Sequence, residues 1–368
     1  MKKLSIQQSV FLDVLRCFAA QMVLVEHVLT SYGFREVFVG SFGVVVFFIL
    51  SGFLISMSAA RDAERNVFTF KGYLIGRFSR IFTLYVPVLF LVLLCDHFVS
   101  VYGGGALEKV DEQRSLINFL GSILMLQQNP ISEILSQVLG LGFFEIKPYG
   151  SARPIWSVAV EWWIYVFFGG VFFYKTKEPG GHGLSIILIS LFLFSVVVVL
   201  FNTVSGIGHN LTLIWFLGVG GWLIFSKGFF IKYFSRRELY AFLVLTIMLF
   251  AARMLHMELS PIFNLVVPYD IVLTVIFFLA FLVVLELVDK VRVSPKVRLL
   301  SKYFSNTSYA LYLTHFTVLN AFYSFGLLNN ILDGVIVFVV CNLVSFLAYF
   351  AFDRHYRIVA MYLNNRVR

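Results

Sequence analysis

Residues 9–28 read SVFLDVLRCFAAQMVLVEHV, an apolar stretch of helical length that nevertheless carries Arg16 and His27. Ionisable side chains cost several kcal/mol in hydrocarbon, so within a membrane span they usually face the protein interior or a water-filled cavity. The two residues are close to three helical turns apart, so they share one face of a helix, about 16 Å apart along its axis. The stretch therefore predicts a membrane-spanning helix with a polar track, and chemistry is expected along that track.

The composition of the whole chain favours the same interpretation. Its 368 residues are 60% hydrophobic and only 13% charged, and the mean hydropathy is +0.88. Soluble domains do not have this composition, whereas polytopic membrane proteins do. Cys17, Cys95 and Cys341 all lie in apolar segments, so we expect no disulfide and no metal site. No tightly bound cofactor is expected either.

Ten apolar segments are long enough to span a bilayer, and they are 8–30, 38–60, 81–102, 154–174, 184–203, 209–226, 238–255, 267–289, 307–326 and 332–352. An eleventh, 115–128, is too short to span and contains Gln127 and Gln128, which predicts a re-entrant or interfacial helix. We therefore expect an all-α polytopic protein of about ten transmembrane helices, forming one integral membrane domain over residues 1–368.

The distribution of positive charge predicts the orientation of these spans. With the N-terminus inside, most lysines and arginines fall on inside segments, and the outside segments hold only Arg35, Lys109, Arg114, Lys147, Arg153 and Arg253. Treating 115–128 as a true span would destroy this bias. The positive-inside rule thus predicts that both termini are cytoplasmic. The net charge of +9 follows from topology and from contact with anionic membrane lipids, so no nucleic-acid partner is expected.

The first span holds the leading candidates for chemistry. Asp13 lies one turn before Arg16, so the two can pair and lower the cost of burial. An imidazole titrates near neutrality, which makes His27 a natural general base for a hydroxyl nucleophile. The alternative is that the Asp13–Arg16 pair is structural and that His27 is a hydrated imidazole at the interface.

A second group lies at the start of the fourth span. Ser157 and Glu161 are four residues apart and share a helix face, in the outer half of the span at a depth similar to that of His27. A carboxylate there can orient an imidazolium or bind sugar hydroxyls. Alternatively, Glu161 pairs with a cation such as Arg153.

Two further groups are expected near the inner face. Arg77 and Arg80 lie one turn apart in an inside loop, 71–80, at the membrane edge. Two guanidiniums at that spacing can hold phosphates, although topology alone also favours arginine there. Tyr312 and His315 lie one turn apart in the ninth span, where a single histidine is more often structural.

Five motifs occur in a fixed order along the chain. They are 12–20 LDVLRCFAA followed by His27, 47–55 FFILSGFLI, 77–80 RFSR, 156–161 WSVAVE and 308–315 SYALYLTH. In this order the chain resembles acyltransferase family 3, membrane proteins that O-acylate cell-surface glycans and related molecules. The resemblance extends from the first span almost to the last.

The resemblance implies a membrane O-acyltransferase, with acetyl as the expected group. Acyl-CoA on the cytoplasmic side would be the co-substrate, and a hydroxyl of a cell-surface or lipid-linked glycan would be the acceptor. His27 would be the catalytic base or acyl relay, supported by Arg16, and Glu161 would complete the acceptor site. Arg77 and Arg80 would bind the phosphates of the donor. The remaining motif residues expected to contact substrate are Asp13, Ser157, Tyr312 and His315. The expected location is the bacterial cytoplasmic membrane.

The chain departs from the family pattern at two positions. Val45 occupies a position that is often acidic in relatives, and Trp162 occupies one where a second acidic residue is usual. Some relatives carry an extracytoplasmic hydrolase-like domain, which this chain is expected to lack. It would then either complete the transfer itself or hand the acyl group to a separate extracytoplasmic partner. The competing interpretation is a polytopic transporter or flippase of a glycolipid or small metabolite. A scaffolding protein would leave the burial of Arg16 and His27 unexplained.

Overall fold

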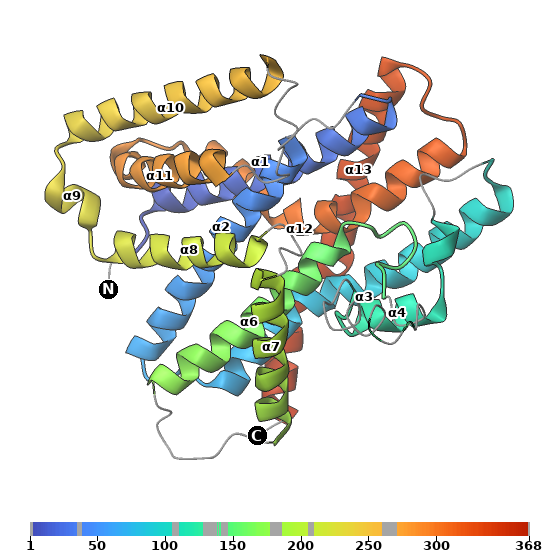
Figure 1. Cartoon of the computed structure of the whole chain (residues 1–368), viewed down its shortest axis with the longest axis horizontal. Helices are drawn as coiled ribbons and strands as arrows, with labels where there is room; N and C mark the ends of the chain where they lie inside the picture. The colour runs from blue at the N-terminus through green and yellow to red at the C-terminus, as the bar shows by residue number, and fades with distance from the viewer. Residues whose placement is uncertain are drawn as a thin grey trace. The chain divides into compact units, whose positions relative to one another are not determined.

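The computed structural model describes residues 3–34, 39–104, 110–127, 138, 140, 146–176, 186–204, 210–259 and 271–366. The long helices shown in Figure 1 are α1 (Ile6–Ser31), α2 (Val39–Glu64), α3 (Phe70–Tyr102), α6 (Ile155–Thr176), α7 (Ile186–Val204), α8 (Leu211–Ser226), α10 (Arg236–Leu259), α11 (Ile271–Leu287), α12 (Pro295–Ser324) and α13 (Ile331–Ala351). Shorter helices are α4 (Leu116–Ile123), α9 (Phe229–Tyr233) and α14 (Tyr356–Arg366), with 3-10 turns at Asp111–Gln113, Val288–Lys290 and Asp353–His355. The described residues contain no β-strand.

Each of the ten predicted spans corresponds to one of the long helices. Seven of the described helices are long and apolar enough to cross a membrane, and α8 is a shorter apolar helix. The protein is therefore an all-α, multi-pass membrane protein, as the sequence predicts. The predicted short segment contains α4, which has only eight residues and so cannot span a bilayer. Arg35, Lys109 and Gln128 lie outside the described residues.

Two helices begin well before the predicted spans. α3 begins at Phe70, where the Thr69 side chain caps it by accepting a hydrogen bond from the Gly72 amide at 3.0 Å. α12 begins at Pro295, a residue suited to the first helical position. Residues 71–80, predicted to form an inside loop, are therefore helical, because the capped helix begins before the apolar segment and includes these polar residues. That they lie on the inside stays a prediction. Arg77 and Arg80 are helical, and Tyr312 and His315 lie near the middle of a 30-residue helix.

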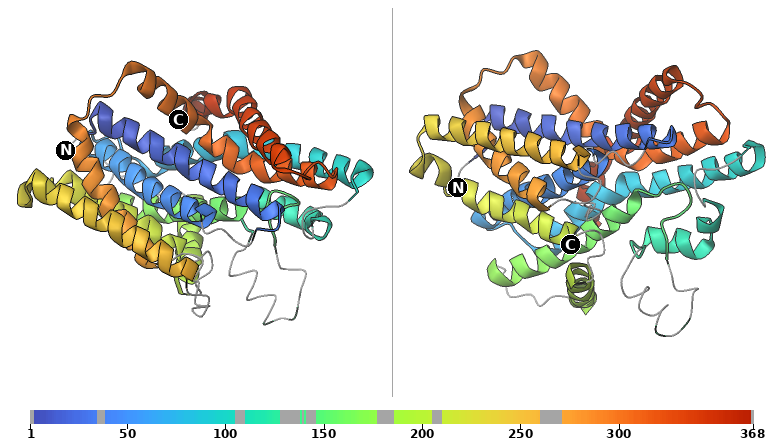
Figure 2. Two further views of the ribbon diagram at one scale, coloured as in Figure 1. Left: turned by 90° about the horizontal axis from the view of Figure 1, so that it is seen from above. Right: turned by 45° about the horizontal axis from the view of Figure 1, so that its top comes forward.

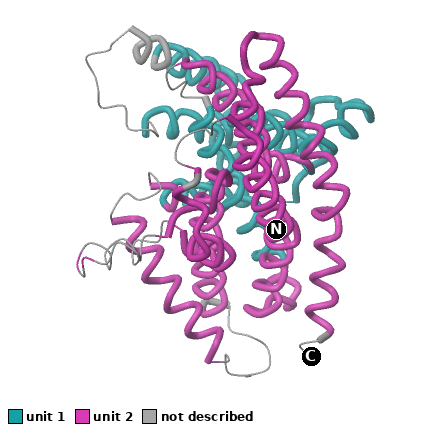
Figure 3. The backbone as a smooth tube through the Cα atoms, turned by 90° about the vertical axis from the view of Figure 1, so that its right-hand side faces the viewer, with its two compact units in different colours: residues 1–23, 38–61, 213–306 teal, residues 24–37, 62–212, 307–368 magenta. Residues whose placement is uncertain are grey.

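The chain divides into two compact units (Figure 3). Unit 1 comprises residues 1–23, 38–61 and 213–306, and unit 2 comprises residues 24–37, 62–212 and 307–368. Helices α1, α2, α8 and α12 each contribute to both units. The single domain expected over residues 1–368 stays a prediction.

Unit 1 is organised by a close crossing of α2 and α8. A Cβ added at Gly52 would lie 2.0 Å from the carbonyl oxygen of Trp215, and one added at Gly218 would lie 2.2 Å from that of Ile49. This approach lets the fully buried Phe53 pack edge-on against Trp222 of α8, at 5.6 Å between ring centroids. Elsewhere in unit 1, α10 lies alongside α11 (Figure 2).

Unit 2 is built around α3, the longest helix, with 33 residues. α6 packs on it through Phe82 and Trp162, whose ring centroids are 5.2 Å apart. α4 is attached by a hydrogen bond from the Tyr85 hydroxyl to the Ser122 carbonyl, at 2.9 Å. α14 also packs along α3. The buried Asp96 accepts a hydrogen bond from the Ser151 amide at 2.8 Å, which holds the turn preceding α6 against α3.

The crossing of α2 and α8 predicts a position-specific effect of a single methyl group. Gly218→Ala should destabilise the protein by about 1–3 kcal/mol, because the new Cβ overlaps backbone that cannot move aside cheaply. Gly220→Ala, on the same helix, is the matched control, since among the described residues no atom lies within 4 Å of its added Cβ. Thermal unfolding in detergent measures both variants. Equal melting temperatures for the two would contradict the proposed crossing.

Candidate active site

Two histidines from distant parts of the sequence meet in unit 2. The ring of His27, on α1, stacks on that of His315, on α12, with 5.3 Å between centroids and 30° between planes. Phe316 approaches the His27 ring edge-on, at 5.1 Å and 88°. His315 is only 1% exposed. The structure therefore brings together two residues that the sequence identified separately.

Hydrogen bonding defines the tautomer of His315. Its Nδ1 lies 2.9 Å from the carbonyl oxygen of Leu311. A carbonyl only accepts, so Nδ1 carries the proton and, in the neutral ring, Nε2 carries the lone pair. Within the described part of the chain, Nε2 is buried without a hydrogen-bond partner. A basic nitrogen is thus held in a buried position beside the ring of His27.

One turn before His315 on α12, Tyr312 links this helix to the start of α6. Its hydroxyl lies 2.6 Å from the Ser157 hydroxyl, and each of the two hydroxyls also lies 3.2 Å from the carbonyl of Pro154. Each hydroxyl has one proton, so one donates to the carbonyl while accepting from the other. Tyr312 and His315 thus lie level with Ser157 and His27. α12 begins twelve residues before the predicted span, and the expected position of these two residues near the inner face stays a prediction.

Glu161 lies one turn beyond Ser157 on α6. Its carboxylate accepts a hydrogen bond from the hydroxyl of Tyr165, on the same helix. Its predicted depth, similar to that of His27, stays a prediction.

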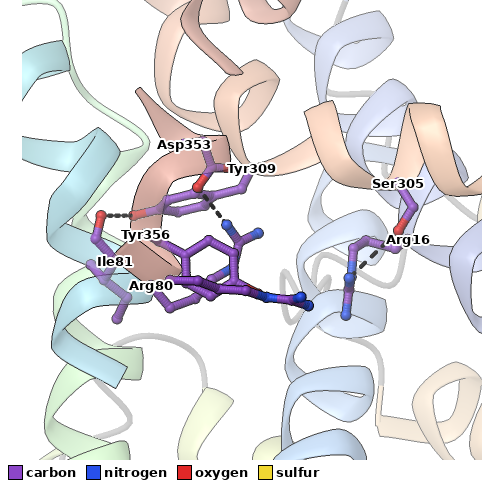
Figure 4. A network of polar contacts seen from close by, with 8 residues as sticks. Arg16, Arg80, Ile81, Ser305, Tyr309, Asp353 and Tyr356 are labelled. Carbon is purple, nitrogen blue, oxygen red and sulfur yellow. Dashed lines mark hydrogen bonds and ion pairs between the residues drawn. The ribbon is translucent and has the colours of Figure 1, made fainter. Parts of the chain in front are cut away.

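Arg80 is held in a network of its own (Figure 4). Its guanidinium forms an ion pair with the buried carboxylate of Asp353. The rings of Tyr309 and Tyr356 lie beside it, with 5.5 and 5.0 Å from the guanidinium carbon to the ring centroids. Tyr309 in turn donates a hydrogen bond to the carbonyl of Ile81, at 3.3 Å.

Arg77 differs from Arg80 in its surroundings. Its guanidinium carbon lies 5.7 Å from the centroid of the Tyr73 ring. Its Nε is buried without a hydrogen-bond partner among the described residues. A buried N–H of this kind is costly unless a ligand or water accepts from it.

Arg16 and Asp13 share a partner within unit 1. The Ser305 hydroxyl donates to the Asp13 carboxylate at 2.9 Å and lies 3.5 Å from a terminal nitrogen of Arg16, at the outer limit of hydrogen bonding. Figure 4 shows the contact between Arg16 and Ser305. Ser305 of α12 thus contacts both of the residues that were expected to pair.

Sequence reasoning missed Ser305, Tyr309, Tyr356 and Asp353. Tyr309 lies inside a quoted motif, and Asp353 is an acidic residue immediately after an apolar span, which is a signal that could have been used. Nothing local identifies Ser305. The described residues contain no group of three or more His, Cys, Asp or Glu side chains that could hold a metal ion.

Buried imidazole, hydroxyl, carboxylate and guanidinium groups on membrane helices are typical of a membrane-embedded enzyme. The family model for acyltransferase family 3, described as an acyltransferase domain, matches residues 9–350. The chain therefore belongs to this family and is a membrane acyltransferase, which confirms the resemblance seen in the sequence. Comparisons with curated proteins and with solved structures found no match.

The contact between α6 and α12 can be measured as a coupling energy. Ser157→Ala, Tyr312→Phe and the double variant should give a coupling of about 1 kcal/mol in the free energy of unfolding, since each single change removes the same buried hydrogen bond. Unfolding in detergent–denaturant mixtures supplies the four values. Strictly additive effects would mean that the two hydroxyls do not interact.

Proposed function

We propose that the protein transfers an acetyl group from cytoplasmic acetyl-CoA to a hydroxyl of a cell-surface or lipid-linked glycan, in the bacterial cytoplasmic membrane. The observation that carries the proposal is the stacking of His27 on the buried His315. Imidazole is the side chain best suited to take a proton from a hydroxyl near neutral pH. A membrane-embedded transferase also needs its base away from bulk water, where hydrolysis of the donor competes with transfer.

In the proposed reaction His27 acts as the general base. Its ring nitrogen takes the proton of the acceptor hydroxyl as the oxygen attacks the thioester carbonyl. The new C–O bond forms, the C–S bond breaks, and the thiolate of CoA leaves with the electron pair of that bond. The thiolate then takes the proton back from the imidazolium, so the products are the glycan ester and free CoA. His315, with its Nδ1 proton engaged by Leu311, would keep the neighbouring ring in place.

The arginines of α3 are the proposed site for the phosphates of the donor. Arg77 has a buried Nε without a partner among the described residues, and the Arg80 side chain keeps 29% of its surface exposed. One face of α12 carries three residues at successive intervals of three positions: Tyr309, Tyr312 and His315. Since Tyr309 contacts Arg80 and His315 contacts His27, this face joins the two ends of the site over about 9 Å of helix axis.

Three assignments rest on the sequence alone. Arg16, on the same helix as His27, and Asp13 are expected to support the base or the donor. Glu161 is expected to complete the acceptor site. A separate extracytoplasmic partner that passes the acyl group onward also stays a prediction.

Removing the base should abolish the chemistry. In purified protein, His27→Ala should lower acetyl-CoA-dependent acetylation by between about 10²- and 10⁴-fold, the usual contribution of a positioned general base. His97→Ala, at an exposed histidine of α3, is the matched control and should keep full activity. Release of CoA thiol and mass spectrometry of the glycan measure both products.

Normal acetylation by His27→Ala would refute the proposed mechanism. The whole assignment can be tested separately by mass spectrometry of the surface polysaccharides from a deletion strain and its parent. Loss of an acyl ester supports the transferase. By contrast, a purified protein that moves a glycolipid across vesicles with no dependence on acetyl-CoA would favour the transporter.

The phosphate site predicts a change in donor affinity. Arg77→Ala combined with Arg80→Ala should raise the KM for acetyl-CoA at least about tenfold, because charge-assisted hydrogen bonds to phosphate are worth about 1.5–3 kcal/mol each. Arg65→Ala, at an exposed arginine in the segment before α3, should leave the KM unchanged. Steady-state rates over a range of acetyl-CoA concentrations measure the effect, and an unchanged KM in the double variant would exclude the phosphate role.

A further inference from the structure

The segment that follows α13 contributes to the donor end of the site. The family match ends at residue 350, and the chain continues through the 3-10 turn Asp353–His355 into α14. α14 packs along α3. Two residues of this segment, Asp353 and Tyr356, contact the guanidinium of Arg80. A part of the chain beyond the matched domain thus reaches one of the proposed phosphate-binding arginines.

The buried carboxylate of Asp353 is costly without a cation. Its side chain is 0% exposed, and an isolated charge in such a place loses more from desolvation than an ordinary contact returns. Its ion pair with Arg80 offsets that cost. A buried pair of this kind adds little net stability compared with apolar residues of similar volume, so stability alone does not account for it.

The geometry leaves Arg80 able to bind a further anion. A guanidinium has five N–H donors in a fixed fork, and the ion pair with Asp353 uses the terminal nitrogen Nη1. With 29% of the Arg80 side chain exposed, part of it is open to an approaching ligand. The rings of Tyr309 and Tyr356, at 5.5 and 5.0 Å, restrict how the guanidinium can turn.

We propose that Asp353 is a positioning residue that, together with Tyr356, orients Arg80 to bind the phosphates of the acyl-CoA donor. This inference rests on the proposed function, since it assigns a further residue to the same donor site. A guanidinium held in one orientation loses less side-chain freedom when it binds phosphate, so its affinity for the donor is higher. Asp353 touches neither donor nor acceptor and acts through Arg80.

The test separates donor affinity from turnover. Asp353→Asn should raise the KM for acetyl-CoA about tenfold, the size expected for a charge-assisted contact that is no longer well oriented, while kcat at saturation stays close to the wild-type value. The rate with acetyl-pantetheine, which lacks the nucleotide phosphates, should be unchanged. Asp353→Glu should restore part of the affinity. Tyr356→Leu should weaken acetyl-CoA binding more than Tyr356→Phe, which keeps the ring.

Asp333→Asn is the matched control, because this carboxylate caps the start of α13. Its described contacts there are with backbone amides and not with an arginine.

A lower melting temperature for Asp353→Asn with an unchanged KM would show that Asp353 is purely structural and would overturn the proposal. A KM below the wild-type value would also overturn it, since Asp353 would then compete with the donor. If Asp353→Asn does not fold, the two Tyr356 variants decide the matter by the same measurement. Wild-type protein that fails to bind acetyl-CoA would instead refute the proposed donor.

Discussion

A polar side chain inside a membrane span needs a partner from the protein, because hydrocarbon offers none. Three described contacts of this chain meet that constraint. Asp353 is matched by Arg80, Tyr312 by Ser157 and Asp13 by Ser305. In each case the partner comes from a different helix, so the same contacts that satisfy polar groups also hold helices together within their unit.

Helix α12 supplies a large share of these partners. Ser305 contacts a residue of unit 1, while Tyr309, Tyr312 and His315 contact residues of unit 2. Within unit 2, the spacing of Tyr309, Tyr312 and His315 along α12 gives a polar face with Arg80 at one end and His27 at the other. In the proposed reaction this face would connect the donor site at Arg80 with the general base His27.

Much of the fold could be predicted from the sequence, since hydropathy is a local property. The ten helices and the short α4 follow from runs of apolar residues and their lengths. The starts of α3 and α12 could not be predicted in this way, because polar residues continue both helices past the apolar segments. For the site, the motifs identified His27, Ser157, Tyr312 and His315, but not which of these side chains contact one another. Asp353 was missed because its partner Arg80 is 273 residues away.

The sequence by itself determined that this is an all-α membrane acyltransferase, since the lengths of the apolar segments, the distribution of positive charge and the order of the motifs are all properties of the sequence alone. Only the tertiary structure decided which side chains meet. His27 stacks on His315 and Asp353 pairs with Arg80 because the rotation and relative shift of packed helices bring these particular faces together. Those quantities depend on close fits such as that of Phe82 against Trp162, which involve residues far apart in the chain, and no local pattern encodes them.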